Sequence, residues 1–448
     1  MRGNSERGPL QTTAITCSQG TRYRLKTTRS REQPGYLQQI RFDTHYRKAP
    51  SLDMSGEALS IALPLPRLPA DILDAVVEHV EDTNTLKILS LVSSQFLRPT
   101  RRILFHALTV GTHDIHATQR WIDHFEWKSC VHILRLRGSP TLDGSPSFGL
   151  LEDVLMRFPA VKELTLFDYE ALDQYWSHSS PSIHLPSIKK LFMHSVHTKR
   201  FSGLAKVLAT FPALFDLKVH HVEWRETDDG TPESQAFLRD APRHPIQKLD
   251  VWSCWTKPLL NYLFPADTFV QLRQGEIDIY SEFCVPRWRP IVERAGRHLE
   301  HLTIHYRGYD DVDLLDLAVN TELKSISLDF ALYDFVPDWI LQTLASLRSR
   351  VIDRISLDLQ ETRMFGLSLD PLKFGQLDQL LSGAQFSSLK AVNIDFEFID
   401  AREYEEPVND EGRVADMKIA IVNRMPQLYG RGILTVEPVI YTLNDDSD

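Results

Sequence analysis

An apolar triplet with the spacing i, i+3, i+5 recurs along most of the chain and is the feature that most limits how it can fold. Each triplet ends in an apolar-x-apolar alternation, which predicts a strand with one apolar face. Successive first positions are 24 to 37 residues apart, which leaves room for a helix between strands. The triplets are Val131-Leu134-Leu136, Val161-Leu164-Leu166, Ile188-Leu191-Met193, Leu214-Leu217-Val219, Ile246-Leu249-Val251, Leu299-Leu302-Ile304, Leu323-Ile326-Leu328, Ile352-Ile355-Leu357 and Leu389-Val392-Ile394, with Leu272-Gly275-Ile277 as a degenerate copy.

Helical patterns lie between the triplets. Apolar residues at i, i+3, i+4 and i+7 predict helices over 151–158 and 204–211. Both patterns run into the same Phe-Pro-Ala sequence, where Pro159 and Pro212 end the helix before the next strand. Two shorter apolar stripes predict further helices, at Ile340/Leu344/Leu347 and at Leu377/Leu380/Leu381.

A unit of one strand and one helix cannot bury its apolar faces without a neighbour, so residues 120–440 are expected to stack into a curved α/β solenoid with a parallel sheet. The triplets resemble those of leucine-rich repeats. The repeats are irregular, because the Asn that usually follows the triplet is replaced by residues such as Tyr169, Val196 and Val222. A helix over 414–425 and a strand at 433–436 are expected to form a C-terminal cap.

The charge balance and the cysteines exclude several classes of protein. There are 50 Lys and Arg against 60 Asp and Glu, a net charge of −10, which argues against a nucleic-acid coat. No apolar run approaches the ~18 residues that span a membrane. Cys17, Cys130, Cys254 and Cys284 are far apart, which favours thiols in a reducing compartment over a zinc site or a disulfide framework. We therefore expect a cytoplasmic or nuclear protein with no nucleic-acid or membrane partner.

The two ends of the chain differ from the rest. The first fifty residues contain ten Lys and Arg against three acids, a net charge of +7, and show no sustained helical or strand period. This composition predicts a disordered basic tail over residues 1–60, and an organelle transit peptide is the alternative. Residues 441–448 are expected to form an acidic tail.

Residues 65–108 form a separate local unit of three short predicted helices. Pro69 suits the first turn of a helix whose apolar stripe runs through residues 72–80. A polar break follows and offers a cap for a second helix. Pro99 is expected to start a third helix that extends to Leu108. Such a small bundle needs a partner or the following domain to cover its remaining apolar surface.

Three segments of this helical unit form a recognisable pattern: Leu68-Pro69-Ala70-Asp71-Ile72-Leu73, Leu91-Val92-Ser93-Ser94-Gln95-Phe96 and Arg101-Arg102-Ile103-Leu104-Phe105. In these segments the unit resembles an F-box. In fungal F-box-like proteins the second half often reads LVCRxW followed by RRxLF, so Ser93, Ser94 and Phe96 depart from that pattern.

The resemblance implies a substrate-recognition subunit of a cullin–RING ubiquitin ligase of the Skp–cullin–F-box type. In that arrangement the F-box docks on the Skp adaptor and the repeats hold a target protein near the ubiquitin-loaded enzyme. The chain itself then performs no chemical step and acts by proximity. The adaptor-binding residues that the resemblance implies are Leu68, Pro69, Ile72, Leu73, Val76, Leu91 and Val92.

We expect the target protein to bind the sheet face that points away from the helices. In each strand the residue directly after the triplet faces that side. This column of residues is rich in aromatic residues and His in the first half of the repeats and acidic in the second, and the neighbouring column adds Phe192. The pattern favours a target with an apolar group and a basic segment. The candidate target-binding residues are Phe167, Phe192, His194, His220, Trp252, His305, Asp329, Asp358 and Asp395.

No catalytic or cofactor motif is found in the sequence, which has no Gly-x-Ser-x-Gly elbow, Walker loop, dinucleotide fingerprint or His-Glu-x-x-His motif. His301 and His305 are expected on a strand, where they lie ~13 Å apart and too far for one metal ion. We therefore expect no enzymatic activity, no cofactor and no metal. The alternative to the ligase is a non-ligase protein-interaction scaffold, which the departures at Ser93 and Ser94 leave open.

Overall fold

The computed structural model describes residues 12–16, 22–28, 39–42, 69–111, 121–138, 150–170, 172, 185–226, 243–252, 256–279, 284–306, 315–332, 338–361, 373–399 and 410–441. The chain divides into two compact units, Met1–Arg137 with Arg157–Val161, and Gly138–Met156 with Lys162–Asp448. The expected tails over 1–60 and 441–448 lie largely outside the described residues. Within the first of them the structure has an antiparallel sheet of β1 (Thr12–Thr16), β2 (Arg22–Thr28) and β3 (Gln39–Phe42).

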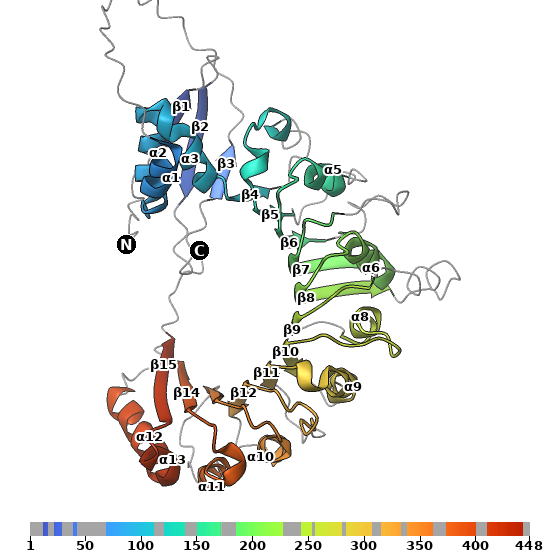
Figure 1. The fold of residues 1–448 in the computed structure, drawn as a ribbon, viewed down its shortest axis with the longest axis vertical. Helices are drawn as coiled ribbons and strands as arrows, with labels where there is room; N and C mark the ends of the chain where they lie inside the picture. Colours follow the sequence, from blue (N-terminus) through green and yellow to red (C-terminus); the bar gives the residue numbers. More distant parts are fainter. Residues whose placement is uncertain are drawn as a thin grey trace, which may run out of the picture. The chain divides into compact units, whose positions relative to one another are not determined.

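The main sheet has 12 parallel strands, hydrogen-bonded in the order of the sequence, and is not closed (Figure 1). The prediction of an α/β fold with a parallel sheet is therefore confirmed. The strands are β4 (Ala107–Gly111), β5 (Ile133–Arg137), β6 (Glu163–Tyr169), β7 (Lys190–Arg200), β8 (Asp216–Glu226), β9 (Lys248–Trp252), β10 (Gln274–Ile279), β11 (His301–Tyr306), β12 (Ser325–Leu332), β13 (Arg354–Glu361), β14 (Ala391–Ile399) and β15 (Leu434–Tyr441).

The apolar triplets set the register of this sheet. Each strand from β5 to β14 carries the second and third residues of one triplet, and the second residues of neighbouring triplets are paired across the sheet, as Leu191 is with Leu217. The first residue of each triplet precedes the strand and is no more than 3 % exposed. Every triplet therefore contributes a strand whose apolar face is buried, as the spacing predicts.

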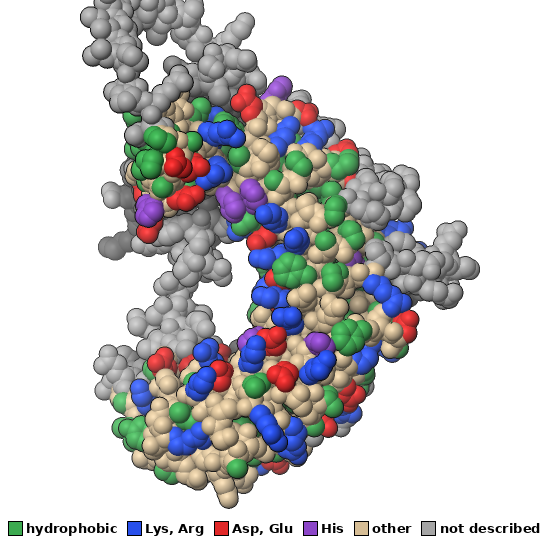
Figure 2. All heavy atoms as spheres, in the orientation of Figure 1, with side chains coloured by type: hydrophobic (Ala, Val, Ile, Leu, Met, Phe, Trp, Pro, Cys, Tyr) green, Lys and Arg blue, Asp and Glu red, His purple; other side chains and the backbone are tan. Residues whose placement is uncertain are grey.

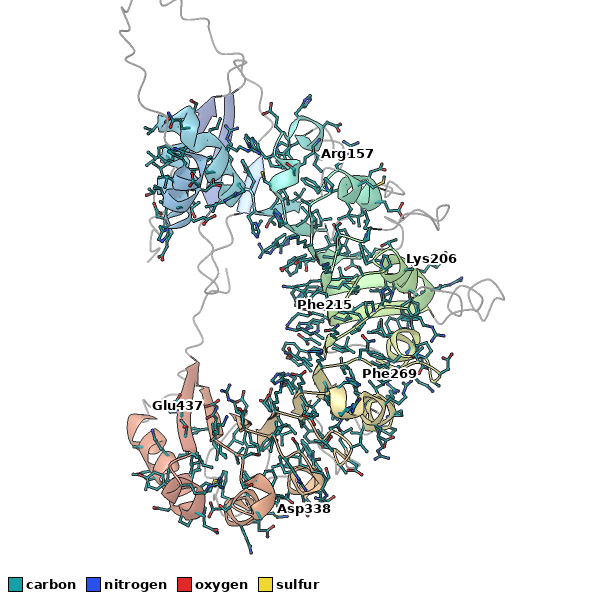
Figure 3. The ribbon with its side chains drawn as sticks, in the orientation of Figure 1. Arg157, Lys206, Phe215, Phe269, Asp338 and Glu437 are labelled. Atoms are coloured by element: carbon teal, nitrogen blue, oxygen red, sulfur yellow. The ribbon has the colours of Figure 1, made fainter. Side chains whose placement is uncertain are left out.

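Helices cover that apolar face in the second unit. Figure 1 shows α6, α8, α9, α10 and α11 on one side of the strands, and in Figure 3 Lys206, Phe269 and Asp338 mark this helical side while Phe215 lies on the strand side. The four helices predicted between triplets are confirmed as α5, α6, α10 and α11. The bounds are α5 (Leu150–Met156), α6 (Phe201–Ala209), α8 (Thr256–Leu263), α9 (Val285–Ala295), α10 (Asp338–Ser346) and α11 (Phe374–Leu381).

The C-terminal part of the second unit has the expected helix and strand, with one further helix between them. α12 (Asp410–Arg424) and α13 (Pro426–Gly430) precede β15, which pairs with β14. Asp378 on α11 is buried and accepts hydrogen bonds from the backbone N–H groups of Gln427 and Leu428, at 3.0 and 2.9 Å. This carboxylate therefore fixes the start of α13 to α11.

The first unit contains α1 (Ala70–Glu78), α2 (Thr83–Val92) and α3 (Ser94–Leu104). The expected start of the third helix at Pro99 is wrong, because the Ser93 side chain caps α3 by accepting a hydrogen bond from the N–H of Gln95. Pro99 lies inside α3, and Leu108 belongs to β4. Within the described part of the chain, no helix has the length and apolarity needed to cross a membrane.

Candidate functional site

The side of the sheet opposite the helices, here called the open face, carries most of the candidate target-binding residues. One side chain per strand, directly after each triplet, points to this face because it alternates with the buried residues. The strand pairing places these residues in one row from β6 to β15. The row is Phe167, His194, His220, Trp252, Asp278, His305, Asp329, Asp358, Asp395 and Glu437.

Three neighbouring strands carry a bulge next to this row. Asp168, Ser195 and His221 occupy the same position of β6, β7 and β8 and have left-handed backbones, with φ of 58°, 51° and 52°. The pairing skips these residues and resumes one position later, where Val196 is paired with Val222. An extra residue shifts the alternation by one. His220 and His221, which follow each other in sequence, therefore both contribute to the ring contacts described below.

Gly138 makes the first bulge possible. Its N–H donates a 2.7 Å hydrogen bond to the carbonyl of Phe167, and a Cβ at this position would lie 2.3 Å from the carbonyl oxygen of Asp168. That distance is below any real contact, so only glycine fits beside the bulged backbone.

Six half-buried or exposed rings form a continuous surface on the open face of β6 to β9. We call them the ring surface: Phe167, Phe192, His194, His220, His221 and Trp252. Most neighbours meet edge to face, and centroid distances are 5.7 Å for Phe167–Phe192, 5.0 Å for Phe192–His220 and 5.5 Å for His220–Trp252. His194 lies 5.4 Å from His221. Burial and the two neighbouring imidazoles lower the pKa of His194, which favours its neutral form.

Charged groups border the ring surface on the β8–β9 side. The Lys218 ammonium donates a 2.9 Å hydrogen bond to Asp250, and Nε2 of His220 lies 2.9 Å from the other carboxylate oxygen. Burial raises the pKa of Asp250, but His220 and Lys218 outweigh this effect and hold it below its ordinary value. Asp250 is therefore ionised at neutral pH and lies against the His220 ring.

His305 continues the surface with a different environment. Its ring stacks on Trp252 at 6.2 Å and 17°, and its two nitrogens contact the carboxylates of Asp329 and Glu276 at 2.6 and 2.9 Å. Burial lowers the pKa of His305, but the two carboxylates outweigh it and raise the pKa to about 9. His305 is therefore a cation at neutral pH, with both nitrogens donating.

The remaining carboxylates of the row differ in how far they face solvent. Asp278 and Asp329 are buried, and Asp329 already contacts His305, whereas Asp358 and Asp395 are half-buried and Glu437 is exposed. Burial and the nearby Glu437 raise the pKa of Asp395. Asp329 therefore supports His305, and the half-buried or exposed carboxylates of the row lie on β13 to β15.

The described residues among those implied as adaptor-binding are Pro69, which precedes α1, and residues of α1 and α2. Ile72 and Val76 on α1 and Leu91 and Val92 on α2 are 46–71 % exposed, and Pro69 is also exposed. Leu73 is buried inside the three-helix unit, and Leu68 lies outside the described residues. Figure 2 shows hydrophobic side chains gathered on this part of the first unit.

Sequence reasoning missed four residues of the open face: His221, Lys218, Asp250 and Glu276. His221 was missed because strict alternation assigns it to the buried side. A signal was available, since the next buried residue in β6 to β8 comes three positions after the triplet, as Val222 does after Val219, whereas alternation requires two. Lys218, Asp250 and Glu276 each lie two residues before the row residue of the same strand. Their contacts are with neighbouring strands, and strand pairing is what brings Asp250 close to His220 and Glu276 close to His305.

The open face offers rings, imidazoles and carboxylates for noncovalent binding. Among the described residues, no group of three or more His, Cys, Asp and Glu side chains is arranged to hold a metal ion. Cys284 is buried and Cys130 half-buried, and neither forms a disulfide. The chain matches no protein-family model, and no curated protein matches it.

Proposed function

We propose that the chain is a substrate-recognition subunit of a Skp–cullin–F-box ubiquitin ligase. In this proposal α1 to α3 form an F-box-like module that docks on the Skp adaptor. The second unit is an irregular leucine-rich-repeat-like solenoid whose open face binds the target protein. The chain has no catalytic role of its own, and catalysis comes from the proximity of the target to the ubiquitin-loaded subunit.

The observation that carries the proposal is the exposed apolar surface of the three-helix unit. Isolated exposed apolar residues are common, but here Ile72, Val76, Ile88, Leu91 and Val92 all belong to two short helices and are each at least 46 % exposed. Concentrated exposed apolar side chains indicate a protein-binding surface. Four of these five residues are the ones that the F-box resemblance assigns to the adaptor.

The helices can lose these side chains without losing their own packing. Leu73, Val77 and Leu86 are buried in this three-helix unit, as are Pro99 and Thr100 of α3. Arg102 of α3 also forms ion pairs with Asp74 and Glu78 of α1, at 3.3 and 2.9 Å. Binding and folding can therefore be separated experimentally.

The test is co-purification of the full chain with the Skp adaptor and cullin. The variant Ile72→Ser/Leu91→Ser removes one exposed apolar side chain from each helix and should abolish adaptor binding. The matched control Phe269→Ser/Ile419→Ser removes side chains of similar exposure, 66 % and 57 %, from the second unit and should retain it. Thermal unfolding of both variants should remain close to that of the unaltered chain.

A non-ligase scaffold is the other candidate, and one observation favours it. Ser93, where the fungal F-box-like pattern has Cys, is used in this chain as the N-cap of α3. The segment that departs from the pattern thus has a structural role here. If the unaltered chain does not retain the adaptor, the ligase proposal fails and the scaffold remains.

A further inference from the structure

The amino ends of β6 to β9 carry a basic surface that the open-face row does not include. Figure 2 shows Lys and Arg side chains gathered over these strands. We call this surface the basic edge: Lys162, Lys189, Lys190, Phe215 and Lys248. We propose that the basic edge binds an acidic peptide segment of a partner protein, with an apolar residue of the segment on Phe215 and its Asp or Glu side chains on the lysines. This binding is additional to the adaptor and open-face contacts and does not depend on the proposed function.

The backbone hydrogen bonds bring these residues to one edge of the sheet. The carbonyl of Lys162 accepts hydrogen bonds from the N–H groups of Lys189 and Lys190, at 2.9 and 3.1 Å. The carbonyl of Lys189 accepts in the same way from Phe215 and that of Phe215 from Lys248, at 3.0 and 2.9 Å. The segments that lead into β7, β8 and β9 all belong to the described residues, at 185–189, 210–215 and 243–247. Lys162, Lys189 and Phe215 therefore occupy equivalent positions at the start of three neighbouring strands.

The lysines of the basic edge are more exposed than the acids beside them. All four lysines are exposed, whereas Glu163 and Asp216 are half-buried. Glu163 contacts Lys190 at 2.6 Å. Burial raises the pKa of Asp216 more than the neighbouring Lys248 and Lys190 lower it.

The local charge of this edge is positive although that of the whole chain is negative. Four lysines against two acids leave a local charge of +2, and the whole chain has a net charge of −10. Salt at physiological concentration largely screens charges that lie more than ~8 Å away. The local balance therefore decides, and the basic edge attracts anionic groups.

Phe215 gives the basic edge an apolar centre. It is half-buried, and Figure 3 shows it on the strand side of the second unit. Lys190 at the start of β7 and Lys248 at the start of β9 are both paired with Asp216, the residue directly after Phe215. An aromatic side chain bordered by charges on both sides is typical of an interface anchor, because the ring supplies apolar area and the charges select the partner.

Charge complementarity favours an acidic peptide over a nucleic acid at this edge. A nucleic acid brings a continuous row of phosphates and is held by neutralising many of them, whereas Glu163 and Asp216 interrupt the lysines. A peptide can place Asp or Glu opposite the lysines and an apolar side chain opposite Phe215. The basic edge therefore fits a short segment with acids on both sides of an apolar residue.

The strand order sets the spacing within the bound segment. Lys162 is two strands from Phe215 and Lys248 is one strand away on the other side, which at ~4.8 Å per strand corresponds to roughly 10 and 5 Å. A peptide that crosses the strands in an extended conformation advances ~3.3 Å per residue. The acids are therefore expected within about three residues of the apolar residue on one side and about two on the other, in either chain direction.

The test measures binding of fluorescein-labelled peptides to the full chain, without adaptor, by fluorescence anisotropy. The probes have a central Leu, Phe or Trp with about three Glu on each side, which covers this span. At least one should bind with a Kd below ~1 mM, and raising the ionic strength from about 0.05 to 0.5 M should weaken its binding by about tenfold.

Two variants of the basic edge should weaken this binding. Lys162→Glu/Lys189→Glu should weaken it by about tenfold or more. Both side chains are exposed and neither forms an ion pair within the described part of the chain, so thermal unfolding should stay close to that of the unaltered chain. Phe215→Ser should weaken the binding by about threefold to tenfold.

The matched controls lie on the helical side of the second unit. Lys206→Glu/Lys257→Glu changes the net charge equally at exposed positions of α6 and α8, and Phe269→Ser removes an exposed aromatic side chain. Both controls should bind the probes as the unaltered chain does. Equal weakening by the two charge variants, equal binding of probes with Gln in place of Glu, tighter binding of a single-stranded oligonucleotide of the same charge, or no binding by any probe would each overturn the inference. Adaptor binding is measured separately, so this inference can fail while the ligase proposal stands, and the reverse.

Discussion

His305 is a residue whose protonation is controlled by direct contacts with its neighbours. It has two carboxylate partners, stacks on Trp252 and has a pKa raised from 6.5 to about 9. A group with a raised folded-state pKa stabilises the fold fully below its unfolded value, and the contribution disappears as the pH rises through the folded value. The stability that His305 provides should therefore fall between pH 6.5 and 9.

The variant His305→Gln tests this directly. At pH 6.5 to 7 the unaltered chain should be more stable than the variant by about 2 to 3 kcal/mol, the order expected for this pKa shift. The difference should shrink toward zero near pH 10. Chemical unfolding at both pH values measures it, and comparison with the variant cancels the titration of lysines and tyrosines. A difference that does not change with pH would contradict the ionic role of His305.

His244 shows that a histidine in this fold can have the opposite behaviour. It is buried, its Nδ1 donates to the carbonyl of Phe211 at 3.2 Å, and burial lowers its pKa to about 4. Its charged form has no compensating carboxylate among the hydrogen bonds described, so acid opposes the fold at this position. The environment, and not the residue type, sets the sign of the pH dependence.

At the scale of elements, the bulges of β6 to β8 determine what the open face presents. Without the extra residue, each strand would place one side chain per two residues on this face. The extra residues, Asp168, Ser195 and His221, shift this alternation by one position in their strands. Their backbones are in a region that costs free energy for a non-glycine residue. The strain coincides with the ring surface, which is part of the open face that we assign to the target protein.

Gly138→Ala should disturb this arrangement and Gly275→Ala should not. A Cβ at Gly138 collides with backbone at 2.3 Å, so the bulge must shift, with an expected loss of about 1 to 3 kcal/mol in the free energy of unfolding. A Cβ at Gly275 lies 3.5 Å from two leucine side chains, an ordinary contact, and removes backbone entropy from the unfolded state. Denaturant unfolding of the two variants separates the cases. Equal stability of both variants would show that the bulge tolerates a side chain beside Gly138.

At the scale of the whole molecule, most of the sheet could be predicted from the triplets. Leu191, Leu217 and Leu249 are examples: they are buried and paired in register, because each is the second residue of a triplet and the same triplet recurs in the next strand. The sequence does not predict the side-chain contacts between successive strand–helix repeats. His305 contacts Asp329 and Glu276, which lie 24 and 29 residues away, and only the register brings them together. The candidate row was therefore predictable, but not which of its carboxylates is buried.

Because each strand–helix repeat packs on its neighbours, removing the last repeats should affect the whole sheet. A chain ending at Glu361 lacks β14, β15 and the helices α11 to α13, so β13 becomes an edge strand with exposed backbone groups and loses the cover on buried residues such as Leu357 and Leu359. An uncovered parallel edge with an apolar face promotes aggregation. We expect this truncated chain to aggregate or to unfold without cooperativity, as measured by light scattering and calorimetry.

A control chain ending at Tyr441, which keeps β15 complete, should behave like the full chain. If the chain ending at Glu361 remains monomeric and melts at the same temperature as the full chain, the C-terminal strands and helices do not act as a cap. Each strand–helix repeat would then be more independent than the shared core of the sheet suggests.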